Sequence, residues 1–138
     1  MSARLLVLDT NIVLDLFVFS DEAVQPVRAG LESRQFRWLA TRAMRDELER
    51  VLAYAQIVPR LASCRLAAND VLAAFDRHSE RVEPPARAAL TCRDPDDQKF
   101  IDLAVAHGAM LLSKDRAVLA LTKRLVALSV RAGSALSA

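Results

Sequence analysis

The sequence predicts an α/β fold with a mainly parallel central sheet of four to five strands, flanked by helices. Short apolar runs alternate along the chain with longer segments in which an apolar residue recurs every three to four positions. Strands that are apolar throughout are typical of parallel sheets that helices cover on both faces. The chain has 138 residues, 53% of them hydrophobic, and only three glycines. This length and composition predict one domain over residues 1–138, with a frayed tail at 131–138.

Five short segments predict the strands. Four of them are rich in aliphatic or aromatic residues, and the third is a short segment directly before Pro84-Pro85. In chain order the segments are residues 4–8, 36–40, 81–83, 109–113 and 125–130.

Helical periodicity and capping residues predict the helices between these strands. In chain order they are residues 11–19, 22–34, 42–55, 67–78, 94–106 and 115–121. Thr41 can cap the third helix, and residues 57–59 interrupt the pattern after it. Asp94-Pro95 opens the fifth helix, with proline placed where its missing N–H costs nothing, and His107-Gly108 ends it.

Composition excludes several classes of protein. No apolar stretch approaches the ~18 residues of a membrane helix, and the first residues lack a signal-peptide pattern, so we expect a cytoplasmic protein without membrane contact. Cys64 and Cys92 stand alone, which favours reduced thiols over a disulfide or a zinc site. The net charge is only +2, and the excess of arginine over lysine can reflect genome composition as well as phosphate binding. Aromatic residues are few, so a base-stacking platform has little material.

Two acidic residues directly follow predicted strands. Asp9 ends the apolar run of residues 5–8, and Asp115 comes after the run of residues 109–113. In an open α/β sheet, ligands bind outside the carboxyl ends of the strands. Asp9 can also serve as the cap of the following helix, but Thr10 and Asn11 beside it are able to hold a carboxylate in orientation.

Two further acidic residues border the apolar faces of predicted helices. Glu47 lies three residues from Met44 and four from Val51, at the edge of an apolar stripe. Asp97 lies one turn before Ile101 on the core face of its own helix. Each has a structural explanation as well, because Arg50 can pair with Glu47 and Asp97 can cap a helix.

The simplest partner for these carboxylates is a metal ion. We expect all four to meet at one edge of the sheet, where no basic residue takes a matching position. Oxygen ligands suit Mg²⁺ or Mn²⁺, and a carboxylate-held metal can hydrolyse a phosphodiester. His78 and His107 lie on or at the end of helices and are left out of the mechanism. The chain also lacks a glycine-rich phosphate loop.

Four segments resemble the motifs of PIN domains, and most closely those of small bacterial PIN proteins related to the VapC toxins of toxin–antitoxin pairs. The segments span residues 4 to about 121: Leu6-Val7-Leu8-Asp9-Thr10-Asn11, Glu47-Leu48-Glu49-Arg50-Val51-Leu52, Cys92 through Ala104, and Leu111-Leu112-Ser113-Lys114-Asp115. The last two together are the more specific.

The resemblance implies a metal-dependent endoribonuclease that hydrolyses single-stranded RNA. The residues implied as catalytic and metal-binding, with Mg²⁺ or Mn²⁺ as cofactor, are Asp9, Glu47, Asp97 and Asp115. Asn11 and Ser113 take the supporting polar places. The implied partners are the RNA substrate, a cognate antitoxin protein and a second copy of the chain in a homodimer.

Two other functions remain open from the sequence. One is a non-catalytic PIN-fold module that binds RNA or protein, although the presence of all four acids favours the nuclease. The other is a magnesium-dependent phosphotransfer enzyme of the phosphatase type. That chemistry typically needs a second aspartate two residues after Asp9, where Asn11 stands.

Overall fold

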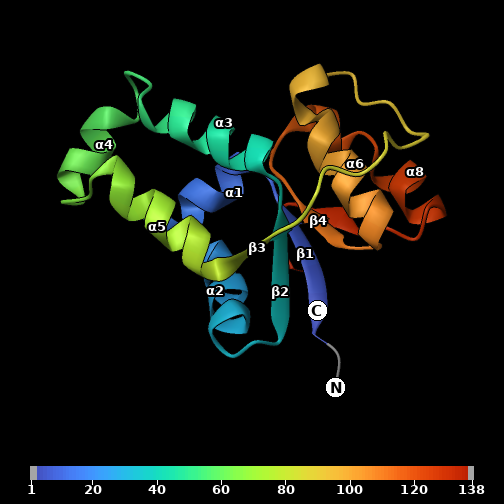
Figure 1. The fold of residues 1–138 in the computed structure, drawn as a ribbon, viewed down its shortest axis with the longest axis horizontal. Coiled ribbons are helices and arrows are strands. Elements are labelled where there is room, and N and C mark those ends of the chain that lie inside the picture. Colours follow the sequence, from blue (N-terminus) through green and yellow to red (C-terminus); the bar gives the residue numbers. More distant parts are fainter. Residues whose placement is uncertain (1–2, 137–138) are drawn as a thin grey trace.

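The computed structural model describes residues 3–136, which contain a five-stranded sheet in which every pair of neighbouring strands is parallel (Figure 1). The strands are β1 (Arg4–Leu8), β2 (Phe36–Ala40), β3 (Ser79–Arg81), β4 (Met110–Leu112) and β5 (Ala132–Gly133). The predicted α/β class with a parallel central sheet is confirmed.

The strand order, β3-β2-β1-β4-β5, reverses its direction next to β1. The chain moves outward from β1 through β2 to β3, then returns to the other side of β1 to add β4 and β5. Such a reversal leaves a crevice outside the carboxyl ends of the two strands that flank it, here β1 and β4. Residues that directly follow β1 and β4 therefore lie at the place where α/β sheets bind ligands.

Helices cover the sheet on both sides. They are α1 (Thr10–Leu14), α2 (Gln25–Glu32), α3 (Arg42–Leu52), α4 (Val58–Ser63), α5 (Ala68–His78), α6 (Gln98–His107), α7 (Arg116–Leu119) and α8 (Thr122–Ala127). Figure 1 shows α1, α2 and α5 on one side of the strands and α6 and α8 on the other; α2 packs against β2, and α6 against β1 and β4. Among the helices of residues 3–136, none has both the length and the apolar character needed to span a membrane.

The core explains why the central strands are apolar on both faces. Successive residues of β1, Leu6 and Val7, point to opposite faces of the sheet, and Leu111 of β4 lies beside Val7. All three are fully buried because helices cover each face. On β2, the indole ring of Trp38 packs edge-on against Phe75 of α5, with the ring centroids 4.8 Å apart.

The first half of the segment predicted as the last strand, residues 125–130, is instead the end of a helix, and no strand forms there. Val118, Leu121 and Leu125 are buried at spacings of three and four residues, which is the period of a helix, whereas Val126 is 61% exposed. The last strand instead follows at Ala132–Gly133, where it pairs with β4. Two residues of the tail expected over 131–138 thus belong to the sheet, and residues 137–138 lie outside the described part of the chain.

Other element boundaries also differ from the prediction. Pro59 does not interrupt helical structure but lies in the first turn of α4, where its missing N–H is tolerated. The third strand begins two residues earlier than expected, at Ser79. The helix expected over residues 11–19 is α1 followed by a π-helical turn, Asp15–Phe19, and a 3₁₀ turn, Glu22–Val24, precedes α2.

Candidate functional site

Asp9 and Asp115 follow the two central strands and are tied together by Ser113. Asp9 comes directly after β1, and its backbone N–H donates to Leu112 O of β4 at 2.9 Å. The buried Ser113 hydroxyl donates to Asp9 Oδ2 at 2.5 Å and accepts from the backbone N–H of Asp115 at 3.0 Å. One hydroxyl group thus fixes both the Asp9 carboxylate and the loop that carries Asp115.

Asp97 reaches the same place from α6. It ends a 3₁₀ turn, Pro95–Asp97, whose first N–H groups are capped by the Asp94 side chain, with Asp96 N donating to Asp94 Oδ1 at 3.0 Å. Because α6 packs against β1 and β4, its first turn lies beside the carboxyl ends of these strands. One carboxylate oxygen from each of Asp9, Asp97 and Asp115 lies within 4.8 Å of the others. We call these three residues the acidic trio.

The acidic trio concentrates negative charge where burial disfavours it. Asp97 is only 7% exposed, and among the described residues its buried Oδ2 atom has no hydrogen-bond partner. Burial, and then the charges of Asp9 and Asp115, raise the pKa of Asp97 to about 7. Burial also raises the pKa of Asp9, although the Ser113 hydrogen bond acts in the opposite direction.

Glu47 lines the same cleft but is not one of the trio. Its Oε1 atom pairs with Lys99 Nζ at 2.7 Å, and Thr10 Oγ1 donates to its Oε2 atom. The sequence predicts either Arg50 or a metal ion as the partner of Glu47 and no matching cation elsewhere. That prediction is wrong, because Lys99, which lies 52 residues away in the chain, reaches Glu47 from α6. Residues so far apart in the sequence give no periodic pattern from which the Glu47–Lys99 ion pair could be predicted.

The four predicted acids share one cleft of about 560 Å³. Asn11 also lines it and is exposed, whereas Ser113 is fully buried and acts on the cleft through Asp9. The donor set consists of carboxylate oxygens, one of which, Asp97 Oδ2, is buried without a hydrogen-bond partner among residues 3–136. Hard divalent cations prefer such oxygen ligands, so the residues present fit a cation of this kind.

Lys114, in the loop that follows β4, pairs with a carboxylate outside the acidic trio. Its Nζ atom pairs at 2.6 Å with Asp15 Oδ2, and the Asp15 side chain is almost completely buried. Asp15 begins the π-helical turn after α1. This ion pair anchors the Ser113–Asp115 loop to the π-helical turn after α1, and Asp15 was not among the predicted site residues.

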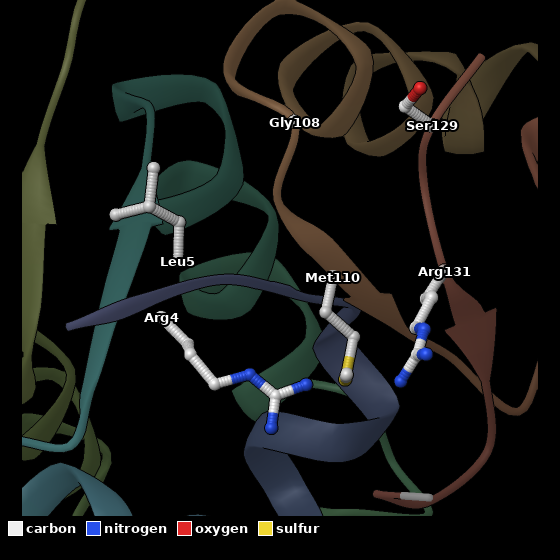
Figure 2. A pocket seen from close by; sticks show the side chains of 6 residues that line it. All are labelled: Arg4, Leu5, Gly108, Met110, Ser129 and Arg131. Atoms are coloured by element: carbon white, nitrogen blue, oxygen red, sulfur yellow. The ribbon is translucent and has the colours of Figure 1, made fainter. Parts of the chain in front are cut away.

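A second cavity, of about 280 Å³, lies at the amino-terminal ends of β1 and β4 and has the opposite character. Figure 2 shows Arg4 and Arg131 reaching into it on either side of Met110. Gly108 and Ser129, which follow the ends of α6 and α8, complete much of its lining. Basic side chains are favourable near helix C-termini, and none of the lining residues could supply a carboxylate to a cation.

Comparison with known proteins identifies the family. A family model described as PIN domain matches residues 5–117, so the chain belongs to the PIN-domain family. A chain of VapBC2 from Rickettsia felis, in a crystal structure with a DNA fragment from their promoter, has a similar fold with a TM-score of 0.63 and 13% sequence identity. The alignment covers 94% of this chain and 98% of that chain. No curated protein matched.

Proposed function

We propose that this PIN-domain protein is a metal-dependent endoribonuclease that hydrolyses phosphodiester bonds of single-stranded RNA. The observation that carries the proposal is the acidic trio, in which three carboxylates approach within 4.8 Å and one buried oxygen has no hydrogen-bond partner in the described part of the chain. Such an arrangement is unfavourable without a cation, and α/β folds commonly use this edge of the sheet for ligand binding.

In the proposed mechanism, the acidic trio and Glu47 hold Mg²⁺ or Mn²⁺. The bound cation would supply charge neutralisation at the scissile phosphate and activation of a water molecule. The protein's own groups prepare the site. Ser113 orients Asp9 through its 2.5 Å hydrogen bond, Thr10 orients Glu47, and Asp97 must release its proton to carry a full charge.

Histidine has no part in the proposed reaction. His78 Nδ1 contacts the carbonyl oxygen of Ala74 within α5, and its ring packs against Phe17. His107 lies at the C-terminal end of α6, whereas Asp97 precedes the first residue of that helix. Proton transfer therefore falls to carboxylates and to water.

The proposed test is a cleavage assay on an unstructured RNA in Mn²⁺. Asp97→Asn and Asp9→Asn should each lower the cleavage rate on the order of 10²-fold or more, because each removes a charge that supports the transition state. Asp46→Asn is the matched control, since Asp46 precedes Glu47 on α3 but makes only a long, exposed ion pair with Arg42 at 3.9 Å. Full activity in Asp97→Asn, or activity that excess chelator leaves unchanged, would refute the proposal.

We further propose that the nuclease is the toxin of a toxin–antitoxin pair and forms a homodimer. The support is the motif resemblance to VapC toxins and the fold shared with the VapBC2 chain. Expression of the wild-type chain alone should stop the growth of a bacterial host, and Asp97→Asn should not. Normal growth with the wild-type protein present and active would contradict the toxin assignment.

One observation favours the alternative of a non-catalytic RNA- or protein-binding module. Lys99 already neutralises Glu47 at 2.7 Å, which leaves three of the four carboxylates to hold a cation. The same assay separates the two functions, because a binding module would retain RNA without cutting it in either Mg²⁺ or Mn²⁺.

A further inference from the structure

The wall of the cleft that α3 forms carries two side chains that the proposed reaction does not use. Arg50 and Tyr54 line the cleft together with Glu47. Arg50 lies three residues after Glu47 on α3, so the helical period places both on one side of the helix. Tyr54 stands just beyond the end of α3, in the turn that leads to α4.

The Tyr54 side chain is 47% exposed, which sets it apart from the other aromatic residues of the chain. The other six are buried in the core or packed against it: Phe17, Phe19, Phe36, Trp38, Phe75 and Phe100. Within residues 3–136 the Tyr54 ring pairs with no other aromatic ring. The Tyr54 ring is therefore available for stacking against a ligand in the cleft.

The backbone holds Tyr54 in a fixed place. Its N–H donates to Val51 O at 3.0 Å, and its carbonyl oxygen accepts from Ile57 N at 2.9 Å and Val58 N at 3.0 Å. Because the turn is already ordered, a ligand that packs against Tyr54 does not have to pay the entropic cost of ordering a loop.

Arg50 is the one basic residue among those that line the cleft in the described chain. It is exposed and has no carboxylate within ion-pair distance among residues 3–136. The neighbouring Glu47 forms its ion pair with Lys99. A free guanidinium group matches the geometry of phosphate oxygens. The carboxylates of the cleft repel RNA phosphates, so a contact that does not depend on charge is needed beside them.

We propose that Tyr54 stacks on an unpaired base of the RNA next to the bond to be cut, while Arg50 contacts an adjoining phosphate. This inference rests on the proposed nuclease function and adds a subsite to it. Stacking on a protein ring requires a base that is not stacked in a duplex, so Tyr54 selects single-stranded RNA. Tyr54 acts here as a positioning residue.

The test is equilibrium binding of two short chains of equal length, a uridine hexamer and an abasic ribose-phosphate hexamer, with Ca²⁺ as the cation. Tyr54→Ala should weaken binding of the uridine hexamer by about 5- to 150-fold and leave binding of the abasic chain unchanged. Tyr54→Phe keeps the ring and should bind both chains as the wild type does. Arg50→Gln should weaken binding of both chains alike. It should also reduce the slope of log K against log salt concentration by about one.

Val58→Ala is the matched control, since Val58 is an equally exposed apolar residue (49%) in the same region that does not line the cleft. In the Mn²⁺ cleavage assay, Tyr54→Ala should raise KM more than it lowers kcat. Wild-type cleavage with an unchanged KM in Tyr54→Ala, or equal losses of both hexamers, would overturn this inference alone. A wild-type protein that neither binds nor cuts RNA would overturn the proposed function with it.

Discussion

Asp97 carries a charge that its surroundings disfavour. Its pKa is raised to about 7 by burial and by Asp9 and Asp115, while an aspartate in the unfolded chain titrates near 3.8. Between these two values the folded protein binds more protons than the unfolded chain. The contribution of Asp97 to stability is therefore fully present below about pH 4 and is lost as the pH rises through 7.

We accordingly expect the metal-free protein to be less stable at pH 8 than at pH 5. Asp97→Asn should stabilise the metal-free protein at pH 8 on the order of 1–3 kcal/mol, the size of the cost of an unsatisfied buried polar group. It should also flatten the fall in stability between the two pH values, although the raised pKa of Asp9 leaves part of it. Denaturant unfolding in the presence of chelator at both pH values measures this. The prediction would be contradicted if the free energy of unfolding fell by the same amount between pH 5 and pH 8 in the two proteins.

Sequence patterns could predict some residues of the site and not others. Asp9 and Asp115 were predictable because each follows an apolar strand, and the strand direction places both at one edge. Lys99 was not, because only the packing of α6 near α3 brings it to Glu47. Tyr54 was not predicted either, although it lies only seven residues after Glu47, because the low aromatic content of the chain argues against base stacking.

At the scale of elements, α6 delivers Asp97 to the site and is fixed at both ends. The 3₁₀ turn, Pro95–Asp97, begins it, and Gly108 ends it in the left-handed conformation with φ of +61°. Glycine at this position is the usual way to close a helix. The prediction failed for α8 because a short apolar run such as residues 125–130 suits a strand or a buried helix equally.

Gly108→Ala should lower the free energy of unfolding by about 1–2 kcal/mol, the cost of a left-handed backbone for a residue with a Cβ atom. An added Cβ would meet no atom within 4 Å, so the cost comes from the backbone alone. Ser129 also has a positive φ, of 65°, and Ser129→Gly should therefore be neutral or stabilising. Denaturant unfolding of both variants is the measurement, and effects of the same sign would argue against this explanation.

At the scale of the whole molecule, the parallel sheet separates charge. All strands point the same way, so the acidic trio collects at the carboxyl edge and Arg4 and Arg131 at the amino edge. The acidic half of this polarity was predictable from the strand directions. The position of β5, and with it the place of Arg131 at the amino edge, was not, because a strand of two residues leaves no recognisable sequence pattern.

A cation bound by the acidic trio should stabilise the entire fold. By mass action, a free Mn²⁺ concentration of 100 times Kd adds about 2.7 kcal/mol to the free energy of unfolding. We expect the melting temperature of the wild type to rise with Mn²⁺ and that of Asp97→Asn to change little. Asp46→Asn should respond as the wild type does, and coincident wild-type curves with and without Mn²⁺ would show that the site does not hold the metal.

The hydrogen bond between Ser113 and Asp9 joins residues 104 positions apart. A ribosome delivers the chain from its amino end, and Asp9 leaves it long before β4 and Asp115 are made. Until Asp115 has emerged, the three carboxylates cannot meet. The growing chain therefore extends beyond Asp115, next to ribosomal RNA and its own message, before the proposed nuclease site exists.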